Sequence, residues 1–138
     1  MPTKLERERL NQLGRERFLE GLATFAARWR ALGYDPTVTF LEQVKGRRGF
    51  HPREVASRCV RLAEEVYGVR FVGRTRAFDE EHGDVQRVGR AQLVSFYESP
   101  AHVLAITLRK LQGRSQRTDD ILAPGLSDEV LLELRRLS

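Results

Sequence analysis

The sequence predicts an α+β fold that is predominantly helical, with three helices followed by a β-hairpin and two C-terminal helices. Apolar residues recur at helical spacing between residues 15 and 67, and Gly and Pro interrupt the pattern at intervals. Beyond Gly68 the chain becomes rich in β-forming residues. The chain of 138 residues is long enough for one domain with a core of its own.

The clearest helical pattern covers residues 15–32, and Gly33 stands where a helix commonly ends. Its apolar residues recur at i, i+3, i+4 and i+7: Phe18, Leu19, Leu22, Phe25, Ala26, Trp29 and Leu32. We expect part of this stripe, Leu22, Phe25 and Trp29, to be buried against the third helix at Val55, Cys59 and Leu62. Residues 1–14 predict a charged helical extension.

Two further helices are predicted before residue 68. Asp35 and Pro36 suit an N-cap and a first helical position, so we expect a short helix from there to about Lys45. Pro52 opens the third helix, over residues 52–67, and Gly68 ends it.

The second half of the chain predicts a hairpin and two more helices. Residues 69–78 and 85–98 are expected to be strands joined by a polar turn, although 85–98 also suits a helix. Ser99 and Pro100 open a helix over 100–112. A loop and a helix over 128–137, capped by Ser127, complete the chain.

This order of helices and strands is that of a winged helix-turn-helix domain. We therefore predict a charged extension over 1–14, a single α+β domain over 15–112, and a C-terminal segment, 113–138, packed on the same domain.

The positive charge is concentrated in the first part of the chain. Residues 1–60 hold twelve Lys and Arg against seven Asp and Glu, whereas residues 61–138 hold twelve of each, so the first part carries the whole net charge of +5. An uneven basic charge is typical of a protein that meets a polyanion. Of the 24 cations 21 are Arg, which binds phosphate or carboxylate bidentately, although a GC-rich or heat-adapted genome would also favour Arg.

The segment 45–53 and the helix that follows it form the candidate nucleic-acid site. Glycines let the backbone approach a ligand closely, and the N-terminus of a helix attracts anions. In a major groove, Arg side chains on the solvent face of helix 52–67 would contact guanine or clamp phosphates. The candidate contact residues are Lys45, Arg47, Arg48, Arg53, Ser57, Arg58 and Arg61. A solvated turn with surface arginines is the alternative interpretation.

The tip of the predicted hairpin is acidic, with Asp79, Glu80, Glu81 and Asp84 within six residues. Phosphate would repel such a wing, so either the wing points away from the nucleic acid or the partner is a protein. The same acids with His82 lack the spacing of a calcium loop, and we expect no metal site.

No catalytic or cofactor motif stands out. The three histidines are far apart, and no HExxH, CxxC, GxSxG or GxGxxG pattern occurs. Residues 68–75 approach a Walker A motif, but they follow a helix instead of a strand. We therefore expect neither an enzyme nor a cofactor, although a hydrolase or nuclease site assembled from distant carboxylates would leave no such pattern.

Composition indicates the compartment. No apolar run is long enough to cross a bilayer, and the single cysteine, Cys59, excludes an internal disulfide and is typical of a reducing compartment. We expect a cytoplasmic protein that does not bind membranes.

Together these features predict a small, basic, non-enzymatic protein that binds nucleic acid, as a DNA-binding or transcription-associated regulator. The alternative is a protein-interaction module, such as a regulator of a polymerase or an assembly subunit, whose Arg and acidic patches bind a protein partner. On the nucleic-acid hypothesis the terminal helices supply packing or a homodimer surface.

Overall fold

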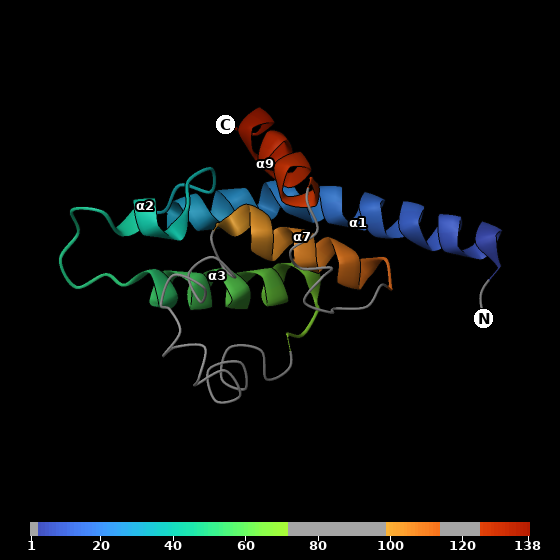
Figure 1. Cartoon of the computed structure of the whole chain (residues 1–138), viewed down its shortest axis with the longest axis horizontal. Coiled ribbons are helices and arrows are strands. Elements are labelled where there is room, and N and C mark those ends of the chain that lie inside the picture. The colour runs from blue at the N-terminus through green and yellow to red at the C-terminus, as the bar shows by residue number, and fades with distance from the viewer. Residues whose placement is uncertain (1–2, 72–98, 114–124) are drawn as a thin grey trace.

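The computed structural model describes residues 3–71, 99–113 and 125–138. Within these ranges 73% of the residues are helical and none is in a strand. The helices are numbered as in Figure 1 and are α1 (Lys4–Ala31), α2 (Phe40–Val44), α3 (Pro52–Tyr67), α7 (Pro100–Leu111) and α9 (Leu126–Arg136).

The prediction of an α+β fold with a winged-helix order is wrong, because the described part of the chain is helical and contains no sheet. Of the expected hairpin, only residues 69–71 are described, and they form no strand. Phe71 is buried, its backbone N–H donates to Glu64 Oε2 at 3.1 Å, and Lys110 lies over its ring. β-Forming residues are residues whose side chains pack well on a half-buried surface. For Phe71 that surface is provided by the helices α3 and α7 and not by a sheet. The rest of the expected hairpin lies outside the described residues.

A single long helix, α1, includes both the predicted charged extension and the apolar stripe. Thr3 and Glu6 start it with a reciprocal capping box, in which each side chain accepts from the other residue's backbone N–H. Its last residue is Ala31, with Leu32 as the C-cap, and Gly33 follows at the predicted stop position with a φ of +92°.

The end of α1 is a Schellman motif. The N–H of Gly33 donates to the carbonyl of Arg30, and the N–H of Tyr34 donates to the carbonyl of Trp29. The rings of Tyr34 and Trp29 pack with centroids 4.5 Å apart, which is the apolar contact that commonly accompanies this motif.

Two glycines in α1 allow other helices to approach its backbone. A Cβ built on Gly14 would lie 2.8 Å from the Leu111 carbonyl carbon and oxygen, at the end of α7. A Cβ built on Gly21 would lie 2.5 Å from Cε1 of Tyr67, at the end of α3. The close contacts of α1 with α7 and with α3 are therefore possible only because residues 14 and 21 are glycines.

Hydrogen bonds join α1 and α3 beside Gly21. The buried hydroxyl of Tyr67 donates to the Phe18 carbonyl at 2.9 Å, and Arg17 Nη2 donates to the Tyr67 carbonyl at 2.5 Å. The rings of Tyr67 and Phe18 are stacked, with centroids 5.5 Å apart. These contacts hold the last turn of α3 against the middle of α1.

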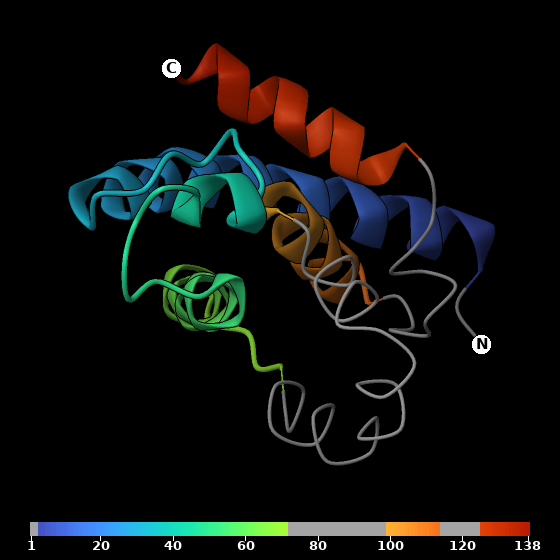
Figure 2. The same ribbon diagram turned by 60° about the vertical axis from the view of Figure 1, so that its left-hand side comes forward.

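The helices are arranged around α1 and α7, which lie against each other in the middle of the molecule (Figure 1). Figure 2 shows α3 and α9 on opposite sides of this pair, while α2 lies near the C-terminal end of α1. One cluster of buried residues runs through all of these helices. Its largest fully buried side chains are Phe18, Leu22, Phe25, Trp29, Phe40, Val55, Val103, Leu104, Ile106, Leu108, Val130 and Leu134. The predicted burial of Leu22, Phe25 and Trp29 together with Val55, Cys59 and Leu62 is confirmed.

The other predicted helix bounds agree with the structure to different degrees. The third helix has the predicted bounds, and α7 ends one residue before the prediction. The second begins at Phe40, because Asp35 forms an Asx turn with Thr37 and Thr39 caps the helix instead. The last begins at Leu126 with Gly125 at its N-cap, so Ser127 lies inside it.

We predict that Trp29→Ala lowers the free energy of unfolding by about 3–5 kcal/mol, the usual cost of deleting a large aromatic side chain from a core. Trp29 is 0% exposed and lies between Phe25 and Tyr34. The measurement is chemical denaturation. Leu32→Ala, at a position 58% exposed near the end of the same helix, is the control and should change stability by about 0.5 kcal/mol or less. Similar losses in the two variants would contradict the assignment of Trp29 to the core.

We also predict that Gly21→Ala is destabilising by about 1–3 kcal/mol, because the added methyl group would overlap the Tyr67 ring. At an open position in a helix the same replacement stabilises, by up to about 1 kcal/mol. The sign of the change in the thermal midpoint is therefore the test. A more stable variant would show that α1 and α3 do not approach each other at this residue.

Candidate functional site

The segment between α2 and α3 carries a group of exposed cations, and we call residues 45–50 the basic turn. Lys45, Arg47 and Arg48 are exposed. Gly46 and Gly49 have φ values of +76° and +80°, which residues other than glycine rarely adopt. A Cβ built on either glycine would meet nothing within 4 Å. The glycines are therefore needed for the backbone conformation of the turn and not to make room for a neighbouring group. The space around them is open.

An aromatic side chain lies within this charged turn. Phe50 is 42% exposed and does not belong to the buried cluster. The guanidinium carbon of Arg47 lies 5.7 Å from the centroid of the Phe50 ring, which is the geometry of a cation–π contact. This contact brings a guanidinium group and an aromatic ring together at the protein surface.

The outer face of α3 is less basic than the sequence suggested. Arg58 and Arg61 are exposed, as are Glu54 and Glu65, and the four share one helix face at i, i+4, i+7 and i+11. Glu65 also accepts a hydrogen bond from Arg28 Nη2 at 2.6 Å. Two carboxylates on this face would repel phosphate, so α3 does not present the basic surface expected of a recognition helix.

The remaining predicted contact residues of α3, Arg53 and Ser57, are half-buried. The N-terminus of α3 was expected to offer free N–H groups to an anion. Instead, His51 caps the helix, and its Nδ1 accepts from the backbone N–H of Arg53 at 3.2 Å. Of the seven predicted contact residues, the turn residues Lys45, Arg47 and Arg48 are grouped, and those of α3 lie among acids or partly inside the protein.

Arg58 has a structural contact that the sequence did not reveal. Its Nη1 donates to the hydroxyl of Tyr34, the residue whose ring packs on Trp29. The sequence did contain one signal for the position of Tyr34: it is an aromatic residue directly after the glycine that ends the helix. The Schellman motif turns such a residue back onto the helix. Arg58 thereby ties α3 to the end of α1.

A shallow polar groove lies beside the basic turn and was also not predicted. It is lined by Arg30, Gly33, Tyr34, Asp35, Thr37, Gln43, Arg47 and Ser138. The hydroxyl of Thr37 donates to Asp35 Oδ1 at 2.6 Å, and this hydrogen bond holds the pKa of the Asp35 carboxyl below its usual range, against a smaller raising effect of burial. The carboxylate therefore stays charged and offsets part of the positive charge of Arg30 and Arg47.

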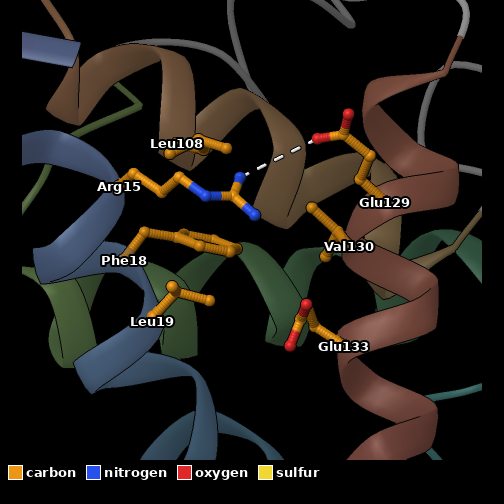
Figure 3. A pocket seen from close by; sticks show the side chains of 7 residues that line it. All are labelled: Arg15, Phe18, Leu19, Leu108, Glu129, Val130 and Glu133. Atoms are coloured by element: carbon orange, nitrogen blue, oxygen red, sulfur yellow. Dashed lines mark ion pairs between the residues drawn. The ribbon is translucent and has the colours of Figure 1, made fainter. Parts of the chain in front are cut away.

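A second, much smaller cleft lies between α9 and the pair α1 and α7. Figure 3 shows Arg15 reaching across it toward Glu129, and the Nη1 and Oε2 atoms of this ion pair are 3.8 Å apart. Phe18, Leu108 and Val130 supply apolar walls. The cleft has room for about one water molecule, so it belongs to the packing of α9 and not to a ligand site.

Three further features concern metal binding, membrane insertion and the cysteine. Among the residues that the structure describes, no group of His, Cys, Asp and Glu could hold a metal ion, and no helix is long and apolar enough to cross a membrane. Cys59 is fully buried, and burial raises the pKa of its thiol, which is the environment of a structural cysteine. The predicted partner-contact residues Asp79, Glu80, Glu81 and Asp84 lie outside the described residues, as does His82.

Comparison with known proteins adds no assignment: no family model, curated protein or solved structure matches the chain.

The roles of the two exposed arginines of α3 can be separated by mutation. We predict that Arg58→Ala lowers the free energy of unfolding by about 1–2 kcal/mol, because it removes a charge-assisted hydrogen bond to Tyr34 in a partly buried site. Arg61→Ala, one turn further along the same face, should change it by no more than about 0.5 kcal/mol. Urea denaturation measures both. Equal effects of the two replacements would contradict the structural role of Arg58.

Proposed function

We propose that the chain is a non-enzymatic nucleic-acid-binding protein that contacts phosphates through the basic turn. The observation that carries the proposal is the grouping of Lys45, Arg47 and Arg48, all exposed, around two glycines with open space beside them. Arg and Lys at such positions bind phosphate oxygens, and the open backbone lets a phosphodiester chain approach closely.

The net charge supports the same proposal. The +5 charge of the chain arises entirely in residues 1–60, which include the basic turn and the whole of α1. A basic region of this kind attracts a polyanion and raises its local concentration. On this proposal the protein acts in the cytoplasm, among the regulators associated with transcription.

The mixed charge of α3 favours a second candidate, a protein-interaction module. Glu54, Arg58, Arg61 and Glu65 would pair with the opposite charges of a protein partner, such as a polymerase or another assembly subunit. This candidate places the contact on α3, and the first places it on the turn, so mutation separates the two.

The test replaces Lys45, Arg47 and Arg48 together by Ala and measures nucleic-acid affinity at several salt concentrations. We expect weaker binding and a plot of log K against log salt that is flatter by about 0.7–0.9 for each phosphate that the variant no longer neutralises. Folding should be nearly unchanged, since all three side chains are exposed.

A matched control replaces Lys4, Arg7 and Arg9, which are exposed near the start of α1 and carry the same total charge. This control should retain most of the affinity and of the salt slope. Equal losses in the two triple variants would show that net charge, and not the turn, is responsible. A wild-type protein that binds no nucleic acid even at low salt would favour the interaction module, and replacing Glu54 and Arg61 by Gln should then weaken its complex with a protein partner.

A further inference from the structure

We infer that the basic turn binds a single-stranded segment of nucleic acid, with the ring of Phe50 as a stacking surface for one base, and not a double helix. The inference rests on the proposed function and adds the class of ligand.

The surroundings of Phe50 carry the first part of the argument. Single exposed apolar side chains are common on protein surfaces, so an exposure of 42% is not sufficient by itself. Phe50, however, follows three exposed cations within five residues and has Arg47 against its ring at 5.7 Å. Proteins that bind single strands combine these two features, since cations hold the phosphates and an aromatic ring stacks on an unpaired base.

The space beside the ring is the second part. Gly46 and Gly49 lie on either side of Arg47 and Arg48, and nothing lies within 4 Å of the position that a side chain would take at either glycine. A sugar–phosphate chain can therefore pass close to the backbone of the turn while a neighbouring base reaches Phe50. Arg47, which contacts the same ring, can bind a phosphate next to that base.

The third part is that neither of the described helices next to the turn, α2 and α3, is suited to enter the groove of a double helix. α2 is only five residues long, and the outer face of α3 carries Glu54 and Glu65 among its arginines. A helix that enters a major groove runs between two rows of phosphates, which would repel both carboxylates. A single strand on the turn needs no insertion of α3.

The experiment measures affinity by fluorescence anisotropy for three labelled ligands with about 12 phosphates each: oligo-dT, oligo-rU and a DNA duplex hairpin. Phe50→Ala should weaken binding of the single strands by about 5- to 150-fold, the range seen when one stacking aromatic is removed. Phe50→Tyr should stay near wild type, because it keeps the ring. Leu41→Ala is the matched control, since Leu41 is 60% exposed in the neighbouring helix. Comparing oligo-dT with oligo-rU distinguishes DNA from RNA.

The inference and the proposed function fail in different ways. A duplex bound as tightly as the single strands, with no effect of Phe50→Ala, would overturn the inference; the proposed function would survive if the Lys45/Arg47/Arg48 variant still bound more weakly than wild type. No binding of any of the three ligands by the wild-type protein would overturn both. Circular dichroism of each variant verifies that the fold is intact.

Discussion

The close approach of α1 to α3 and α7 is the constraint on which the rest of the structure depends. α1 packs against α3, α7 and α9, and at Gly14 and Gly21 the neighbouring groups occupy the space of a missing side chain. Glycine inside a helix costs about 0.5–1 kcal/mol relative to alanine, and the burial of Phe18, Tyr67 and their neighbours offsets that cost. A methyl group at either glycine would separate the helices and open the cluster that joins them.

The same packing determines where the basic turn lies. The segment that links α1 to α3 is held at its start by the Schellman motif and by Tyr34, whose ring packs on Trp29 and whose hydroxyl accepts from Arg58. Near its middle, buried Phe40 joins the core. At the end of the segment, His51 is the N-cap of α3. Between these fixed points, residues 45–50 have no buried side chain, so their charges and the ring of Phe50 remain at the surface.

Electrostatics makes the turn, and not α3, the more suitable surface for a polyanion. Every charged residue of the turn is a cation, whereas the outer face of α3 holds two acids beside its two arginines, and one of those acids is paired with Arg28. The Asp35 carboxylate offsets some of the positive charge in the adjacent groove, and the hydrogen bonds from Thr37 lower its pKa. The proposed site is therefore a local group of cations with one aromatic ring. Such a site suits a flexible chain of phosphates better than the extended surface of a duplex.

Local patterns in the sequence determined much of the helical part of this protein. The bounds of α3, the end of α1 at Gly33 and the burial of Trp29 followed from apolar spacing and from Pro and Gly, because these signals act within a few residues. The grouping of Lys45, Arg47 and Arg48 was also visible, since the three are neighbours in sequence. Tertiary structure decided the rest. Phe71 packs on helices instead of starting a strand, because β-propensity yields to the surface available for burial. The bond from Arg58 to Tyr34 and the Arg28–Glu65 pair join residues 24 and 37 positions apart, and no local rule specifies which distant side chains will meet.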